Sequence, residues 1–257
     1  MTEPLALVTG ASSGIGAALA RLLAERGYDV ALVARRAERL AALASEIGER
    51  HGRKALVIPA DLSLSDAHLP IMAALGGRPV DLLANNAGLS NPEAYWQVPW
   101  ERQRDCLMTL IMAVAGLTHA VLPDMIARRS GRIITISSIV ALSQGGPGHT
   151  VYPAAKAFVH TFMLSLDAEV RQHGIICTSV LPGTTASEFR QANNIEAKAG
   201  GLSDLFSQSS EAVARAAIDG NQRGRLIVIP GWHNRLAALA MKIAPGSLMR
   251  WAGKRIA

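Results

Sequence analysis

The 257-residue chain contains few cysteines, few aromatic residues and few charged residues. Its two cysteines, Cys106 and Cys177, lie far apart in apolar stretches, which indicates free buried thiols in a reducing compartment rather than a disulfide framework. Charged residues make up 18% and hydrophobic residues 49%, a balance that excludes a disordered chain. Because aromatic residues make up only 4% and no nucleic-acid-binding motif occurs, we expect no nucleic-acid partner.

The N-terminal residues show no signal-peptide pattern, because a strand-like run begins at Leu5 without a preceding basic segment. We therefore expect a cytoplasmic protein. Residues 106–123 contain no Asp, Glu, Lys or Arg, but the run is shorter than the ~20 residues that a membrane span needs. Polar side chains such as Thr109 and His119 interrupt it. We predict a buried or subunit-facing helix there.

Acidic residues are absent from Gly220 to the C-terminus, where seven Lys and Arg residues occur. The net charge of +6 is concentrated in this part of the chain. A basic tail favours an anionic surface or substrate, and a solvated basic helix explains the charge equally well. Leu236, Leu239 and Ile243 fall on one face of a predicted helix. We predict that residues 232–257 form a basic helical extension that packs against another subunit, with contact with a membrane surface or coverage of a neighbouring active site as the alternatives.

Short apolar runs alternate with helical patterns along the chain. The runs are rich in Val, Ile and Leu with little polar alternation, which is typical of strands buried on both faces. The alternation predicts an α/β fold, with a Rossmann-like, doubly wound parallel sheet of about seven strands in a single domain over residues 1–231. The predicted strands are residues 5–9, 30–34, 55–59, 80–84, 132–137, 175–181 and 226–229. The predicted helices are residues 14–26, 37–50, 64–75, 100–129, 152–173 and 211–223.

A glycine-rich segment lies between the first predicted strand and the first predicted helix. Glycines there allow a tight turn and close approach to a pyrophosphate, and the helix N-terminus offers free N–H groups and a partial positive charge. This position favours a dinucleotide site over an ordinary glycine-rich turn. The expected cofactor-binding residues of this segment are Gly10, Ser12, Ser13, Gly14, Ile15 and Gly16.

The end of the second predicted strand indicates which dinucleotide binds. Sites for NAD place an acidic residue there, which binds the ribose 2′-hydroxyl. This chain has Arg35 and Arg36 instead, and guanidinium groups pair well with a 2′-phosphate. We therefore predict a preference for NADP(H) over NAD(H), with a solvated arginine pair at a helix start as the alternative.

Several segments, in the same order, resemble the short-chain dehydrogenase/reductase family over residues 4–230. They are Thr9-Gly10 with Gly14-Ile15-Gly16, then Asn85-Asn86-Ala87-Gly88, Ser138, Tyr152 with Lys156, and Pro182-Gly183. The resemblance implies hydride transfer between a nicotinamide dinucleotide and a carbonyl or alcohol carbon of a small molecule. It also implies a homodimer or homotetramer, and we expect no metal site.

Tyr152 and Lys156 are four residues apart on a predicted helix, so they share a face. A tyrosine is normally too weak an acid to exchange a proton at neutral pH, and a nearby ammonium group is expected to lower its pKa. Ser138 ends the fifth predicted strand, where ligands bind in such sheets, and its hydroxyl can stabilise the substrate oxygen. By the resemblance, these three residues are catalytic and Lys156 also holds the nicotinamide ribose. We expect NADPH-dependent reduction of a carbonyl, with Tyr152 as the general acid.

The resemblance implies further contacts with the cofactor. Asp61 and Leu62 follow the third predicted strand and match the family's adenine contact, with a helix N-cap as the alternative role of Asp61. Asn85 is expected to steady the central strands. The other expected contacts are Asn86, Ala87 and Gly88 at the adenine ribose, and Pro182, Gly183, Thr185 and Ser187 beside the nicotinamide carboxamide.

Two positions depart from the family pattern. The helix asparagine that helps to anchor a water molecule of the proton relay falls at Leu110, whose side chain cannot hydrogen-bond. Either another group, such as the hydroxyl of Thr109, holds the water, or proton exchange with solvent is slower. The spacing between Ser138 and Tyr152 is about one residue longer than usual, and the glycine-rich loop 144–148 can absorb the difference.

Apolar side chains favour a lipophilic ketone, aldehyde or 3-oxoacyl group over a small polar sugar, although core packing explains lone apolar residues equally well. By the resemblance, residues 186–210 cover the substrate. The apolar residues of this segment are Phe189, Ile195, Leu202, Leu205 and Phe206, and further pocket candidates are Tyr95, Trp96, Leu142 and His149.

Two other functions stay open at this stage. The enzyme could work in the oxidative direction, with an alcohol and NAD(P)+ as substrates. A non-catalytic dinucleotide-binding sensor or scaffold is favoured by Leu110, but the intact set of Ser138, Tyr152 and Lys156 opposes it.

Overall fold

A computed structural model describes residues 3–143, 145, 150–186 and 207–243. The predicted strands form one parallel, seven-stranded sheet with the order β3-β2-β1-β4-β5-β6-β9. The strands are β1 (Leu5–Thr9), β2 (Asp29–Ala34), β3 (Ala55–Pro59), β4 (Leu82–Asn85), β5 (Gly131–Ile136), β6 (Ile175–Val180) and β9 (Ile227–Val228). The chain reverses its direction of progress between β1 and β4, and ligands of such sheets bind in the crevice at this point. The predicted Rossmann-like fold is confirmed.

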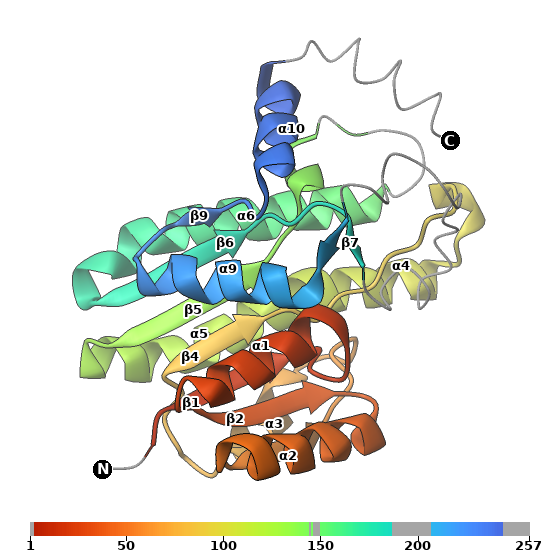
Figure 1. Cartoon of the computed structure of the whole chain (residues 1–257). Coiled ribbons are helices and arrows are strands. Elements are labelled where there is room, and N and C mark those ends of the chain that lie inside the picture. Colours follow the sequence, from red (N-terminus) through yellow and green to blue (C-terminus); the bar gives the residue numbers. More distant parts are fainter. Residues whose placement is uncertain (1–2, 144, 146–149, 187–206, 244–257) are drawn as a thin grey trace.

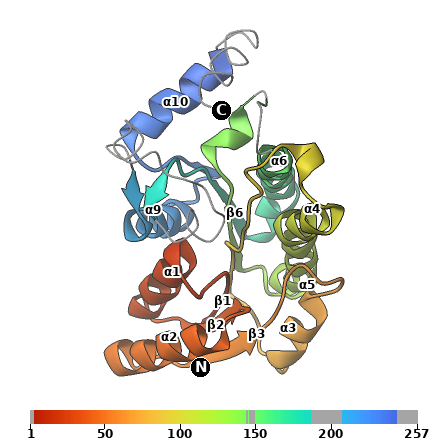
Figure 2. The same cartoon turned by 90° about the vertical axis from the view of Figure 1, so that its right-hand side faces the viewer.

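Helices cover both faces of the sheet, as Figures 1 and 2 show. One face carries α1 (Gly14–Glu25), α2 (Ala37–His51) and α9 (Ser210–Gln222). The opposite face carries α3 (His68–Ala74), α4 (Trp100–Leu107), α5 (Ala113–Arg128) and α6 (Val151–Val170). Short 3₁₀ helices are η1 (Tyr95–Gln97), η3 (Ile139–Leu142) and η4 (Arg171–His173).

The hydrophobic core is divided between these two faces. Successive side chains of a strand point to opposite faces, so Val8 packs with α1, α2 and α9 whereas Leu7 packs with α3, α5 and α6. Both residues are fully buried. Burial on both sides explains why the strands are almost continuously apolar in sequence.

The long helical stretch Trp100–Arg128 is sufficiently long and apolar to cross a membrane. In the fold, however, Leu117, Val121 and Met125 are buried in the core against the sheet. The prediction of a buried helix is therefore confirmed. A π-helical segment, η2 (Met108–Met112), interrupts the α-helix between α4 and α5, which the sequence pattern did not predict.

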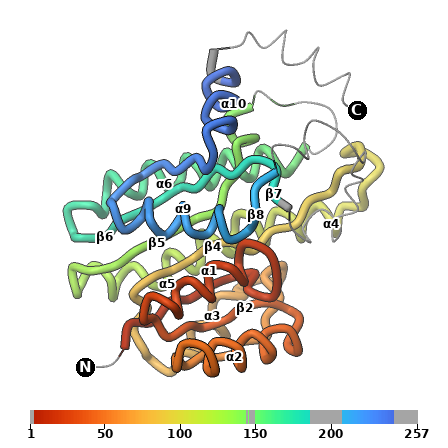
Figure 3. Tube along the Cα trace, in the orientation of Figure 1, coloured from red at the N-terminus to blue at the C-terminus, as the bar shows by residue number. Residues whose placement is uncertain are grey.

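Some boundaries differ from the predictions. Helix α3 begins at His68 rather than at residue 64, because Asp66 has a left-handed φ of 55° that an α-helix does not accommodate. Two short strands were not predicted, β7 (Thr185–Ala186) and β8 (Gln208–Ser209), which pair in parallel and lie side by side in Figure 3. Their pairing joins the two ends of the segment 187–206.

Helix α10 (Trp232–Ile243) follows β9 and projects from the body of the molecule (Figure 1). It forms the first part of the predicted C-terminal extension, and the residues after 243 lie outside the described part of the chain. Its buried side is formed by Asn234 and Ala238, whereas Trp232, Leu236 and Leu239 are exposed.

Candidate active site and cofactor-binding site

The three residues predicted to be catalytic come together at the carboxyl end of β5. Ser138 follows the strand with an extended backbone, and its hydroxyl accepts a hydrogen bond from the Val140 N–H at 3.3 Å. The Ser138 hydroxyl also hydrogen-bonds the phenol of Tyr152, which lies in the first turn of α6. Lys156 lies one turn later, with Nζ 5.6 Å from the centre of the Tyr152 ring.

Lys156 is held in place by the end of β5. Its Nζ donates to the Ile136 carbonyl oxygen at 2.7 Å, and its own carbonyl oxygen accepts a hydrogen bond from the Ser137 hydroxyl at 2.8 Å. The side chain is only 5% exposed. Burial disfavours the charged ammonium group and lowers the pKa of Lys156 from 10.5 to about 8.

The phenol of Tyr152 keeps its proton at neutral pH. Burial raises its pKa from 10.0 to about 12, and the hydrogen bond with Ser138 lowers it by less. The expectation that Lys156 brings this pKa below its usual value is therefore wrong for this structure, because the cost of burying a phenolate is the larger effect. The arrangement provides a proton donor beside a hydroxyl group.

The glycine-rich turn between β1 and α1 brings backbone segments close together. A Cβ atom at Gly10, where φ is 67°, would lie 2.8 Å from the Ala87 Cα, and a Cβ atom at Gly16 would collide with the Gly10 carbonyl. The Thr9 hydroxyl accepts hydrogen bonds from the N–H groups of Asn86 at 2.9 Å and Ala87 at 3.1 Å. The turn and the 86–87 backbone therefore form one unit, with the N-terminus of α1 beside it. This arrangement fits the pyrophosphate of a dinucleotide.

Arg36 connects the end of β2 with the glycine-rich turn. Its Nη2 donates to the Ser12 and Ser13 hydroxyl oxygens, at 2.9 Å in each case. Neighbouring Arg35 is exposed. Both arginines thus lie at the carboxyl end of β2, with Arg36 over the glycine-rich turn.

Asp61 forms a local turn rather than a helix cap. It accepts hydrogen bonds from the Ser63 N–H at 3.0 Å and the Ser63 hydroxyl at 2.8 Å, and α3 begins only at His68. Burial raises the pKa of Asp61, but these bonds and the charge of Arg35 outweigh it, so the pKa is lowered. Asp61 is therefore an anion close to Arg35. The adjoining Leu62 is buried, at 6% exposure.

Asn85, the last residue of β4, and the residues after it contact α5 and the glycine-rich turn. The Asn85 Nδ2 donates to the Thr118 hydroxyl at 3.2 Å, which ties the end of β4 to α5. The Asn86 Nδ2 donates to the Thr9 carbonyl oxygen at 2.9 Å. Gly88 is exposed beyond them.

The loop that follows β6 reaches the same edge of the sheet. The Pro182 carbonyl oxygen accepts a hydrogen bond from the Ile139 N–H at 3.0 Å, and Ile139 adjoins Ser138. The Thr185 hydroxyl donates to the Gly183 carbonyl oxygen at 3.3 Å. Ser187, His149 and the five apolar residues predicted to cover the substrate lie outside the described residues. Among the other pocket candidates, Trp96 is 81% exposed, Tyr95 is 48% exposed and Leu142 is partly buried.

Comparison with known proteins agrees with this geometry. The family model described as short chain dehydrogenase matches residues 4–198. The chain belongs to the short-chain dehydrogenase/reductase family. It is 34% identical to an uncharacterized oxidoreductase of Myxococcus xanthus, over 100% of this chain and 98% of that protein.

Two further relatives carry more specific descriptions. A very-long-chain 3-oxoacyl-CoA reductase of Anas platyrhynchos is 41% identical over 71% of this chain, and the match spans 60% of that longer protein. The solved structure of a short-chain dehydrogenase from Sphingobium yanoikuyae in complex with NADPH is 31% identical, with a TM-score of 0.83 and 92% of each chain covered.

This short-chain dehydrogenase departs from the family pattern at Leu110, as the sequence indicated. Leu110 lies in the π-helical segment η2, is 1% exposed and packs against Cys106 and Ala155. Thr109 is also buried, at 7% exposure. Sequence reasoning missed the π-helical segment and the position of Cys106, whose thiol interacts electrostatically with Lys156. Burial raises the pKa of this thiol to about 11, so it stays neutral.

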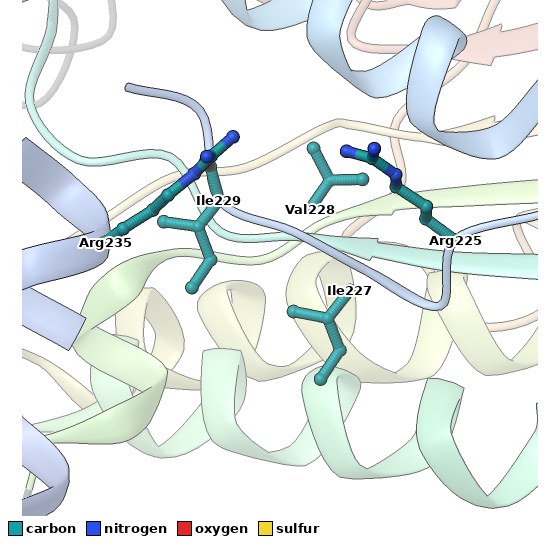
Figure 4. A pocket seen from close by; sticks show the side chains of 5 residues that line it. All are labelled: Arg225, Ile227, Val228, Ile229 and Arg235. Carbon is teal, nitrogen blue, oxygen red and sulfur yellow. The ribbon is translucent and has the colours of Figure 1, made fainter. Parts of the chain in front are cut away.

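A shallow hollow of about 230 Å³ lies at the edge strand β9 of the dehydrogenase. Figure 4 shows Arg225 and Arg235 at its two ends, with Ile227, Val228 and Ile229 between them. Its lining contains none of the predicted catalytic or cofactor-binding residues. The exposed side chain of Ile227 makes this edge a candidate contact surface rather than a reaction site.

Proposed function

We propose that this short-chain dehydrogenase uses NADPH to reduce a lipophilic carbonyl compound to an alcohol. The observation that carries the proposal is the contact of Tyr152 with Ser138 above a buried Lys156, with the phenol protonated at neutral pH. A protonated phenol is the form that carbonyl reduction requires, because the substrate oxygen gains a proton in the reaction.

In this mechanism, the Ser138 and Tyr152 hydroxyl groups hydrogen-bond the carbonyl oxygen and so polarise it. The glycine-rich turn and Arg36 would hold NADPH, which would supply the hydride for the carbonyl carbon. The Tyr152 Oη donates its proton to the oxygen as negative charge develops there. The Lys156 ammonium group, fixed by the Ile136 carbonyl, stabilises the phenolate that remains.

The preference for NADPH is supported by Arg36. Its contacts with Ser12 and Ser13 hold a positive charge over the glycine-rich turn, and β2 is followed by no acidic residue that would bind a free ribose 2′-hydroxyl. The Sphingobium relative was solved with NADPH.

The substrate class is proposed from relatives and from residue types. The Anas relative is described as a 3-oxoacyl-CoA reductase, and the predicted substrate-covering residues of this chain are apolar. We therefore include 3-oxoacyl thioesters with lipophilic ketones and aldehydes. We propose the direction of carbonyl reduction, in which Tyr152 starts protonated.

A turnover assay tests the proposal directly. Purified protein is mixed with NADPH and with ketones, aldehydes or 3-oxoacyl thioesters, and oxidation of NADPH is followed at 340 nm. Tyr152→Phe is expected to lower kcat by a factor of about 10² to 10⁴ while leaving NADPH binding close to normal. Tyr28→Phe removes the hydroxyl of a residue that packs against the core beside β2 and is the matched control.

The outcomes separate the candidate functions. Turnover that survives Tyr152→Phe contradicts the assigned general acid. NADPH binding without turnover of any substrate class would favour the sensor or scaffold, for which Leu110 at the proton-relay position is the supporting observation.

A further inference from the structure

Asn234 is a buried polar residue of α10 that the proposed chemistry does not use. Its side chain is 5% exposed. The Nδ2 atom donates to the Pro230 carbonyl oxygen at 2.8 Å and contacts the side-chain amide of Gln208 at 3.0 Å. A buried amide held by two polar groups is fixed in position, since losing either partner would leave a polar atom unsatisfied.

The other side of this amide lies directly against Gly183. A Cβ atom at Gly183 would collide with Oδ1 and Cγ of Asn234. Gly183 is not among the glycines with positive φ, so its backbone conformation does not require glycine. A side chain at position 183 would therefore have to displace the Asn234 amide.

The loop that contains Gly183 is tied to the catalytic residues on its other side. The Pro182 carbonyl oxygen accepts a hydrogen bond from the Ile139 N–H at 3.0 Å, immediately after Ser138. Helix α10 also packs against η3, which begins at Ile139. A displacement of α10 would therefore also displace the loop, because α10 contacts the loop through Asn234. It also packs against η3, which is hydrogen-bonded to the loop.

The same amide supports the two short strands that flank the segment 187–206. The Gln208 N–H donates to the Thr184 carbonyl oxygen at 3.0 Å, and Gln208 pairs with Thr185 in the register of β7 and β8 (Figure 3). Asn234 contacts the Gln208 side chain. The buried side-chain amide of Asn234 thus connects helix α10 with strand β8 and with the loop 182–185.

We propose that Asn234 is a positioning residue that holds the loop 182–185 in place for the nicotinamide end of the cofactor. This inference rests on the proposed function and on the family resemblance, which implies that this loop lies beside the nicotinamide carboxamide. Asn234 does not touch the reacting atoms. Its amide packs against Gly183 and so limits the positions that the loop can adopt.

Asn234→Ala tests this role because it removes both the Nδ2 donor and the amide that fills the space beside Gly183. We expect kcat for carbonyl reduction to fall about tenfold or more, since displacing reactants by about 1 Å slows a reaction strongly. The Kd of NADPH should stay close to its wild-type value, because the glycine-rich turn and Arg36 are unchanged. The isotope effect on kcat with NADPH deuterated at the transferred position should rise, because hydride transfer becomes more strongly rate-limiting.

A merely structural role predicts a different result. Loss of folded protein lowers kcat but leaves the isotope effect unchanged. Ala238→Gly weakens the same helix at another buried position and is the matched control, which should keep the wild-type isotope effect. Asn234→Ser shortens the side chain beside Gly183, keeps a hydroxyl donor, and provides the same test if the alanine variant does not fold.

A double-mutant cycle tests the contact with Gly183 itself. Gly183→Ala alone should slow turnover, because the new methyl group collides with Asn234. Adding Asn234→Ala should recover part of the lost rate. Wild-type kcat and isotope effect in both Asn234 variants would overturn this inference and leave the proposed function standing. Absence of NADPH-dependent turnover in the wild-type protein would overturn the proposed function, and this inference with it.

Discussion

The substitution Arg36→Ala removes the guanidinium group that lies across the glycine-rich turn, where we propose that the 2′-phosphate binds. In the structure, its Nη2 is 2.9 Å from the Ser12 and Ser13 hydroxyl oxygens. A hydrogen bond to a charged group contributes about 1.5–3 kcal/mol, and 1.36 kcal/mol corresponds to a tenfold change in Kd. Since Arg36 is exposed, solvent screening places the effect at the lower end of this range. We expect the Kd of NADPH to rise about tenfold.

The assay compares the Kd values of NADPH and NADH, each titrated by the fluorescence of the bound nicotinamide. The Kd of NADH should change little in Arg36→Ala, because NADH has no 2′-phosphate. Arg50→Ala is the matched control, since it removes the same charge near the other end of α2, where Arg50 pairs with Glu46. An unchanged Kd of NADPH, or equal weakening of both nucleotides, would refute the assignment of Arg36.

Three further predictions follow from the structure. Gly16→Ala should lower the unfolding free energy by about 1–3 kcal/mol and weaken NADPH binding, because its methyl group collides with the Gly10 carbonyl. In denaturant titrations, the control Gly48→Ala should instead stabilise the protein by about 0.5–1 kcal/mol, since Gly48 lies in a helix with open space around it. The kcat/KM of reduction, measured from pH 6 to 10, should fall as pH rises through about 8, because Lys156 is charged only below its pKa; a flat profile would count against this role of Lys156. The double substitution Leu236→Glu with Leu239→Glu places charges on the exposed face of α10 and should lower the molar mass in light scattering, if that face joins subunits of a homodimer or homotetramer. An unchanged mass with lost binding to anionic vesicles would instead favour membrane contact.

The strands could be predicted from sequence because each is buried on both faces. In β1 and β2, nearly every residue is apolar and fully buried. These strands could therefore be recognised without knowing which side chains face which helix. The glycine-rich turn could also be predicted, because glycines in a turn between a strand and a helix form a recognisable motif, although the contacts of Gly10 with Ala87 come from a distant segment. The family motifs then placed Ser138, Tyr152 and Lys156, which the structure brings together.

Features that depend on contacts between residues far apart in the sequence could not be predicted from the sequence pattern. Strands β7 and β8 are two residues each and exist only because the chain returns to pair with itself. The start of α3 depends on the left-handed backbone of Asp66, a residue type that also occurs within helices. The sequence around Asn234 does not predict its contact with Gly183, because this contact depends on the position of α10 in the fold.

The direction of the Tyr152 pKa shift was also beyond the sequence, and it bears on the direction of the reaction. The spacing of Tyr152 and Lys156 correctly predicts that they are neighbours, but the extent to which α6 and its surroundings bury the phenol depends on tertiary packing. Because burial raises the pKa of Tyr152 above its usual value of 10.0, the phenol of the free enzyme is protonated at pH 7. In the proposed reduction, the phenol starts in its protonated form, which is the abundant form of the free enzyme. Burial does not change the equilibrium between alcohol and ketone, but it selects the protonation state in which the free enzyme meets its substrate, and at neutral pH that state is the proton donor.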